Sequence, residues 1–95
     1  MMHLILFKTD PNSQPRDIKE RKKIWEATIE MMKKEIDSGA IKMLGLSPGG
    51  TDGFMVSTQS PKEILSKRMA GMVPSEFKVL PMLSLEEIED IVNEL

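Results

Sequence analysis

The 95-residue sequence contains no cysteine and no tyrosine, and it has only one tryptophan, three phenylalanines and one histidine. The absence of cysteine excludes disulfides, thiolate nucleophiles, cysteine-ligated zinc and iron–sulfur clusters. One histidine without carboxylates at ligand spacing predicts no metal site, and the sequence indicates no cofactor. No apolar run approaches the roughly 20 residues that cross a bilayer, so we expect no membrane span.

An excess of positive charge is also missing. The chain has 13 basic and 15 acidic residues, a net charge of -2 and a pI near 5.4. Because phosphate contacts dominate nucleic-acid affinity, this balance predicts no nucleic-acid partner. The apolar run in MMHLILFKTD follows no basic segment and precedes no small-residue cleavage site, so we expect a cytoplasmic location. The length predicts a single domain over residues 1–95, small enough that a partner chain would help to bury its surface.

Strands and helices are predicted to alternate along the chain. Apolar and β-branched runs predict strands, the first of them buried on both faces, over residues 3–8, 41–46, 54–58 and 77–82. Apolar residues at helical spacing predict helices over residues 14–37, from 61 to about 71, and from 85 onward. Asn12 or Ser13 is expected to cap the first helix, and capping boxes beginning at Ser60 and Ser84 are expected to open the other two.

This βαββαβ order followed by a terminal helix predicts an α+β, ferredoxin-like fold. Right-handed crossovers then give an antiparallel sheet in the order 4-1-3-2, with the first two helices on one face. Pro81 lacks the N–H that a central strand needs, so the fourth strand is expected at an edge of the sheet.

The stretch GLSPGGTDGFMVS, residues 45–57, is rich in glycine. A phosphate cradle would lead directly into a helix N-terminus, whereas here a strand follows, and the spacing matches no phosphate-binding motif. We therefore interpret residues 48–53 as the turn of a hairpin.

Alternation along the strands assigns residues to two faces. The face expected under the helices carries Leu4, Leu6, Phe54, Val56, Phe77 and Val79. The opposite, open face is expected to carry an apolar patch with polar residues around it: Ile5, Phe7, Met55, Leu80 and Met82, with His3, Thr9, Ser57 and Gln59. Such patches usually mark an interface or a ligand groove. Two copies joined by these faces would enclose a small cavity, so the predicted partner is a second copy, in a homodimer or higher homo-oligomer.

The segments GGTDGFMVSTQSPKEIL and FKVLPMLSLEEI carry a resemblance to a known superfamily. The chain resembles the dimeric α/β-barrel proteins, in which two ferredoxin-like protomers join sheet to sheet. Within that superfamily it is similar to an uncharacterised family of small proteins related to muconolactone isomerase-like proteins. The resemblance implies a dimeric α/β barrel, and it carries over no catalytic residue.

Two functions follow from these expectations. In the first, the protein binds a small organic molecule in a cavity at the sheet-to-sheet dimer interface; the candidate ligand-binding residues are His3, Phe7, Thr9, Met55, Ser57 and Gln59. In the alternative, it is a cofactor-independent isomerase or monooxygenase-like enzyme acting on an enolisable small molecule. His3 is then the catalytic candidate, because imidazole readily exchanges protons near neutral pH. Convergence of the polar candidates on one enclosed cavity would favour the enzyme.

The charges of the first and last helices are opposite. The first helix begins with a basic cluster, Arg16, Lys19, Arg21, Lys22 and Lys23, and the last has five acidic residues and no basic one. Attraction between them is a hypothesis for how subunits dock, and it predicts that association weakens as ionic strength rises.

Overall fold

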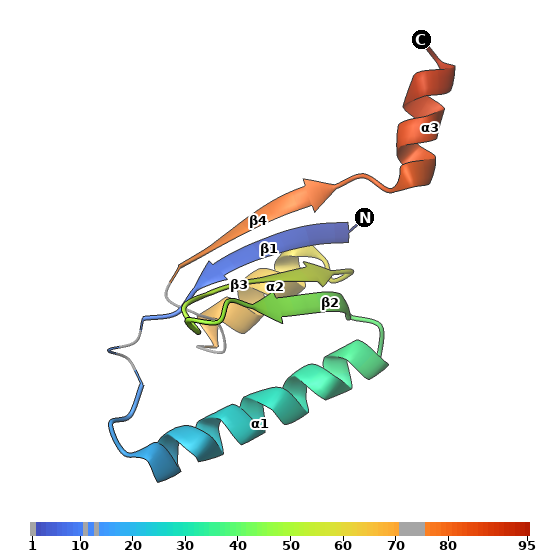
Figure 1. Cartoon of the computed structure of the whole chain (residues 1–95). Coiled ribbons are helices and arrows are strands. Elements are labelled where there is room, and N and C mark those ends of the chain that lie inside the picture. Colours follow the sequence, from blue (N-terminus) through green and yellow to red (C-terminus); the bar gives the residue numbers. More distant parts are fainter. Residues whose placement is uncertain (1, 11, 13, 71–75) are drawn as a thin grey trace.

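The computed structural model describes residues 2–10, 12, 14–70 and 76–95. These residues form an α+β arrangement of strands and helices in the order β-α-β-β-α-β-α (Figure 1). The elements are β1 (Met2–Lys8), α1 (Ile18–Asp37), β2 (Ile41–Leu46), β3 (Asp52–Ser57), α2 (Pro61–Met69), β4 (Glu76–Met82) and α3 (Leu85–Asn93). Within the described chain, no helix is both long and apolar enough to cross a membrane.

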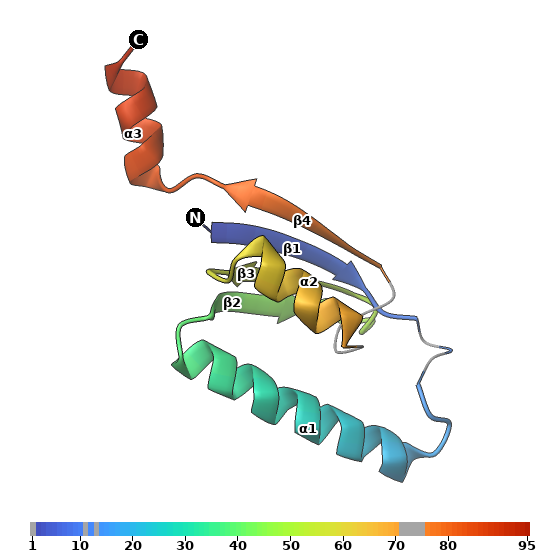
Figure 2. The same ribbon diagram turned by 180° about the vertical axis from the view of Figure 1, so that it is seen from behind.

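The described strands form one open antiparallel sheet in the order β2-β3-β1-β4. Read from the β4 edge, this order is 4-1-3-2, and the arrangement is compatible with a ferredoxin-like fold. β4 is an edge strand, as Pro81 predicts. Helix α2 lies across one face of the sheet (Figure 2), whereas α1 runs beside β2 and α3 projects beyond the end of β4.

The first helix begins later than expected. α1 starts at Ile18 because the side chain of Asp17 caps it, accepting a hydrogen bond from the backbone N–H of Lys19 at 3.0 Å. The prediction that Asn12 caps it is wrong, since the helix begins six residues later and Asp17 is its N-cap. The alternative cap, Ser13, lies outside the described residues. The helix ends where Gly39 adopts a φ of 83°.

Both predicted capping boxes are present. The hydroxyl of Ser60 accepts from the N–H of Glu63 at 3.2 Å, and Ser84 accepts in the same way from Glu87 at 3.2 Å. Each glutamate carboxylate accepts in return from the N–H of its capping serine. Local sequence alone therefore defines where α2 and α3 begin.

The glycine-rich stretch is a hairpin turn, as predicted. The N–H of Ser47 donates to the carbonyl of Asp52 at 2.7 Å, and that of Gly50 donates to the carbonyl of Ser47 at 2.8 Å. Gly50 has a φ of 75°, a left-handed conformation that glycine adopts without a steric penalty. The turn joins β2 to β3 and leads into no helix.

The expected faces of β1 and β3 are wrong. His3, Ile5 and Phe7 are buried beneath the helices, as is Ser57, which lies opposite His3 in the ladder. The open face instead carries Leu4, Leu6, Phe54 and Val56, together with Lys78 and Leu80 of β4. The error arises because both faces of β1 are largely apolar, so alternation separates the two sets without saying which set the helices cover.

The predicted face of Phe77 and Val79 in β4 is correct, because both residues lie on the helix-covered side of the sheet. Phe77 and Val79 lie opposite Phe7 and Ile5 in the ladder and share their face. Cross-strand partners always lie on one face of a sheet, so placing β1 and β4 by register would have revealed the inconsistency. Register between distant strands is a tertiary property that a single sequence does not give.

Candidate functional site

A cavity of about 740 Å³ lies between α1, α2 and the helix-covered face of the sheet. Side chains of β1, β3, α1 and α2 line it, chiefly Ile5, Phe7, Trp25, Met32, Met55 and Ile64. Its volume is within the range of about 300–1,000 Å³ that is typical of small-molecule sites, and so is its mainly apolar lining. The cavity exists because α1 stands beside the sheet and buries none of its residues completely.

The ring of Phe7 is positioned by a glycine. Gly53 lies opposite Phe7 in the ladder, and a Cβ atom added to it would lie 2.6 Å from Cε2 of that ring. The ring therefore rests directly on the glycine backbone, and no other residue type leaves room for it. Phe7 is only 8% exposed, so this contact fixes one aromatic wall of the cavity.

Few polar groups reach the cavity. The hydroxyl of Thr9 donates to the carbonyl of Gly50 at 2.9 Å, which ties the wall to the hairpin turn. The hydroxyl of Thr28 donates to the carbonyl of Ile24 within α1 at 2.8 Å. Gln59 is different, because its amide nitrogen donates no hydrogen bond to any of the described residues. Gln59 thus offers a ligand a free donor.

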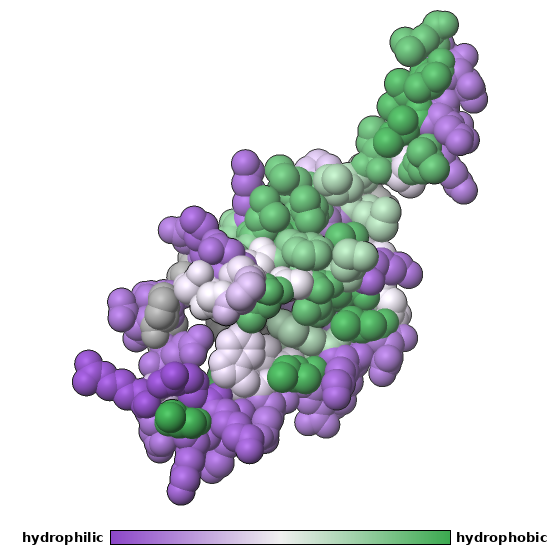
Figure 3. Space-filling view, in the orientation of Figure 1, coloured by the Kyte–Doolittle hydropathy of each residue, from purple (hydrophilic) through white to green (hydrophobic). Residues whose placement is uncertain are grey.

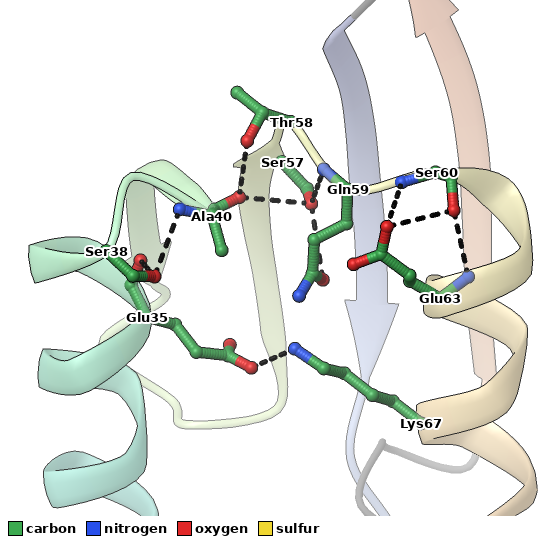
Figure 4. A network of polar contacts seen from close by, with 9 residues as sticks. All are labelled: Glu35, Ser38, Ala40, Ser57, Thr58, Gln59, Ser60, Glu63 and Lys67. Carbon is green, nitrogen blue, oxygen red and sulfur yellow. Dashed lines mark hydrogen bonds and ion pairs between the residues drawn. The ribbon is translucent and has the colours of Figure 1, made fainter.

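The end of the cavity beside Gln59 is held by a polar network (Figure 4). The hydroxyl of Ser57 lies 3.2 Å from the carbonyl of Ala40 and accepts from the N–H of Gln59 at 3.1 Å. Thr58 donates its hydroxyl to the carbonyl of Gly39 at 2.8 Å. These bonds join the end of β3 to the turn that follows α1, and so they orient Gln59 toward α1 and α2.

An ion pair links the two helices across this end of the cavity. The ammonium of Lys67 on α2 donates to the carboxylate of Glu35 on α1, and the side chain of Gln59 points toward the pair (Figure 4). The two side chains are 31% and 20% exposed, so the pair is largely shielded from water. It is the one described contact that ties α1 to α2 through charged groups, and it neutralises both charges.

Arg21 supplies a further charge to the cavity wall. Its Nε donates to the carbonyl of Pro15 at 3.0 Å and one terminal nitrogen donates to that of Arg16 at 3.1 Å. A guanidinium has five N–H donors, so these two bonds leave donors for a ligand. With Glu35 and Lys67 paired, the charged groups of the wall sum to one positive charge.

The structure brings together some of the predicted site residues and separates others. Phe7, Thr9, Met55 and Gln59 line the cavity, but on the helix side of the sheet. The predicted location on the open face is therefore wrong for all four, for the reason of register given above. Ser57 is completely buried and serves the network.

His3 is 6% exposed and is not among the residues that line the cavity. Its Nδ1 atom has no hydrogen-bond partner in the described part of the chain. His3 therefore lies outside the set of residues that line the cavity, whereas Thr9 and Gln59 belong to it.

Sequence reasoning did not identify Arg21, Trp25, Glu35 or Lys67 as residues of the site. Trp25 did show a signal, since it interrupts the aliphatic stripe of α1 with the one tryptophan of the sequence. The ion pair had none, because its partners lie 32 positions apart on separate helices.

The arrangement can hold an apolar molecule, offer it an amide donor and attract a negative charge. No protein-family model, curated protein or solved structure matches this chain in the comparisons made with them. The functional argument therefore depends on the geometry of the cavity.

Proposed function

We propose that the protein is a homodimeric binding module that holds a small, mainly apolar organic molecule, favouring a monoanion, in the cavity between α1, α2 and the sheet. The observation that carries this proposal is the cavity of about 740 Å³ with the aromatic walls of Phe7 and Trp25. Its lining is mainly apolar with a small number of polar groups, as in sites that orient an apolar ligand. The unpaired charge of Arg21 favours an anionic group on that ligand.

The homodimer part of the proposal is supported by the open face of the sheet. That face carries Leu4, Leu6, Phe54, Val56 and Leu80. None of the described helices lies across it (Figure 1), and much of the surface seen from this side is apolar (Figure 3). An antiparallel sheet often leaves one face to water, but that face is then polar. The resemblance to dimeric α/β-barrel proteins also supports sheet-to-sheet association.

Binding is favoured over catalysis by one specific observation. An isomerase or monooxygenase-like reaction would use His3 together with Thr9, Ser57 and Gln59, and only Thr9 and Gln59 line the cavity. The polar convergence that acid–base chemistry needs is thus incomplete. If the protein turns over an enolisable substrate and a His3→Ala variant does not, the enzyme hypothesis would replace the binding hypothesis.

The test uses two probes that differ by one charge. 1-Anilinonaphthalene-8-sulfonate is apolar and anionic, and N-phenyl-1-naphthylamine lacks its sulfonate. Both are titrated into the full chain while the emission of Trp25, the single tryptophan, reports occupancy of the cavity. We expect the anionic probe to bind more tightly. Equal affinity would remove Arg21 from the proposed recognition.

Two methionines on opposite faces of the sheet locate the bound probe. Met55 lines the cavity, whereas Met43 lies on the open face and is 59% exposed. We expect Met55→Gln to weaken binding about tenfold, since a polar group then faces the ligand, and Met69→Gln, at an 80% exposed position of α2, to have no effect. Binding that is weakened by Met43→Gln and not by Met55→Gln would place the ligand at the sheet-to-sheet interface and refute the helix-side site.

A further inference from the structure

Helix α3 leaves its apolar side uncovered. All residues from Leu85 to Leu95 are exposed, and the helix projects away from the sheet in both views (Figures 1 and 2). Its apolar residues occur at helical spacing and form one stripe: Leu85, Ile88, Ile91, Val92 and Leu95. A stripe of this width normally faces a protein core, so α3 has the character of a packed helix without its partner.

The open face of the sheet is the second uncovered apolar surface. Leu6, Met43 and Met82 lie on or beside it with 42%, 59% and 41% of their surface exposed. Figure 3 shows that apolar surface extends over this face and continues onto one side of α3. The sheet and the helix thus present one connected apolar surface.

The exposed area is too large for a compact single chain. The chain exposes 7340 Å², whereas a compact monomer of its mass exposes about 5,500 Å². The difference of about 1,800 Å² is close to what one protomer contributes to a large homodimer interface. The radius of gyration gives the same result, 15.8 Å against about 12.4 Å for a compact chain of this length.

The charges of α3 and the remaining chain are complementary. All five charged residues from Ser84 to the end are acidic: Glu86, Glu87, Glu89, Asp90 and Glu94. The whole chain has 13 basic and 15 acidic residues, so the part that precedes Ser84 has 13 basic and 10 acidic residues. A segment of charge −5 is thus joined to a body of charge +3. Two α3 helices repel each other, and each is attracted to a body.

The dimensions of α3 and of the sheet favour docking of α3 on a second copy of the chain. α3 has nine residues and is therefore about 14 Å long and about 10 Å wide. A four-stranded sheet is about 19 Å wide, so α3 folded onto its own sheet would leave much of the open face in water. A second copy supplies both a sheet and another α3, and so covers both surfaces.

We infer that α3 is an exchange arm, whose apolar stripe seats on the body of a second copy, at the margin of its open sheet face, while the second copy returns its own α3. The inference rests on the homodimer proposed above and adds the element that crosses between the subunits. The geometry assigns Ile88 and Ile91 to the centre of the contact, since they lie midway along the stripe.

The test cross-links the natural chain without substitutions. Unlabelled and ¹⁵N-labelled protein are mixed, equilibrated and treated with a carbodiimide, which joins carboxylates to lysines at zero length. We expect cross-linked peptides that pair an acidic residue of α3 with a lysine of residues 8–78, with about half of them containing one light and one heavy chain. Links found only within light or only within heavy chains would show that α3 folds back on its own body and would overturn the inference.

Native mass spectra of the same mixture show whether the exchange arm alone is wrong or the homodimer is wrong as well. A dimer whose α3 forms no mixed links retains the sheet-to-sheet proposal and overturns the exchange arm. A monomer at micromolar concentration overturns both. Binding of the anionic probe, reported by Trp25, is a separate readout of the cavity and survives either result.

A pair of variants tests the apolar stripe. Ile88→Gln/Ile91→Gln is expected to raise the dimer dissociation constant at least tenfold, since each isoleucine loses its buried contact. Asn93→Gln, on the polar side of the same helix, is the matched control and should leave it unchanged. Far-ultraviolet circular dichroism confirms that both proteins are folded. Equal dissociation constants for the two variants would overturn the contact.

Discussion

Replacement of Gly53 by alanine tests the placement of the cavity most directly. The added Cβ would lie 2.6 Å from Cε2 of Phe7 and 2.8 Å from the carbonyl oxygen of Gly45. The Phe7 ring can tilt away, but the Gly45 carbonyl belongs to the β2–β3 ladder and cannot move without disturbing it. The contact with backbone therefore makes this substitution costly.

The expected loss follows from two opposing terms. Overpacking of this kind costs about 1–3 kcal/mol, and the lower entropy of the unfolded alanine chain returns about 0.5–1 kcal/mol. Because the Gly45 carbonyl cannot move aside, we take the upper end of the overpacking cost, about 3 kcal/mol, so Gly53→Ala should lower the free energy of unfolding by about 2 kcal/mol. With a urea dependence of about 2 kcal/mol per molar, the unfolding midpoint falls by roughly 1 M. The displaced Phe7 ring should also weaken binding of the anionic probe.

Two other glycines of the same hairpin are the controls. A Cβ at Gly49 would lie no closer than 3.9 Å to another heavy atom, so Gly49→Ala should be neutral. Gly50 has open space around it but a φ of 75°, so alanine there should cost about 1 kcal/mol through backbone strain alone. Urea unfolding followed by Trp25 fluorescence ranks the three. If Gly53→Ala is as stable as Gly49→Ala, Phe7 does not rest on Gly53 and the helix-side cavity is refuted.

Two further predictions concern the helices. Ser60→Ala removes the cap of α2 and should lower the free energy of unfolding by about 1 kcal/mol. Ser84→Ala removes an identical cap from the exposed α3 and should instead weaken the dimer. Equal effects of the two variants on urea unfolding of the dilute protein would contradict this prediction. Glu35→Gln leaves Lys67 without its shielded partner and should lower the free energy of unfolding by about 1–2 kcal/mol. A Glu35→Gln/Lys67→Met double variant should lose less stability than the sum of the losses of the two single variants. Additive losses in thermal unfolding would contradict the pairing.

The features that the sequence predicts correctly are local. Ser60 and Ser84 cap helices through bonds that span three residues, and Pro81 restricts its own strand to an edge. The turn at Gly50 likewise depends on a few neighbouring residues. In each case the physical cause lies within one turn of chain, so residue type and spacing are enough to predict it.

The features that the sequence does not predict depend on distant residues. The face of His3 depends on its pairing with Ser57, 54 positions away in the ladder. The cavity depends on where α1 lies relative to the sheet, and the pairing of Glu35 with Lys67 contributes to that position. Alternation alone could not decide between the faces because Leu4 and Leu6 are as apolar as Ile5 and Phe7.

The similarity of the two faces of the sheet is itself informative. On the helix side Phe7 rests on Gly53, and on the open side Phe54 rests on Gly45, its cross-strand partner. Each face thus has an aromatic ring placed on a glycine, although the described helices cover only one face. A ring packed in this way against bare backbone suits a buried surface, so the open side has the packing of a second core.

A Gly45→Ala variant tests whether the ring of Phe54 on the open face faces solvent or is buried in a dimer. The three heavy atoms nearest to the added Cβ would all belong to the ring of Phe54, at 2.5, 3.2 and 3.3 Å. In a monomer the ring can swing into solvent, so the free energy of unfolding should change by less than about 1 kcal/mol. In a sheet-to-sheet dimer the displaced ring would enter the interface, and the dissociation constant should rise about tenfold. Sedimentation equilibrium measures that constant, and a Gly45→Ala dimer as tight as the wild type would show that Phe54 lies outside the contact.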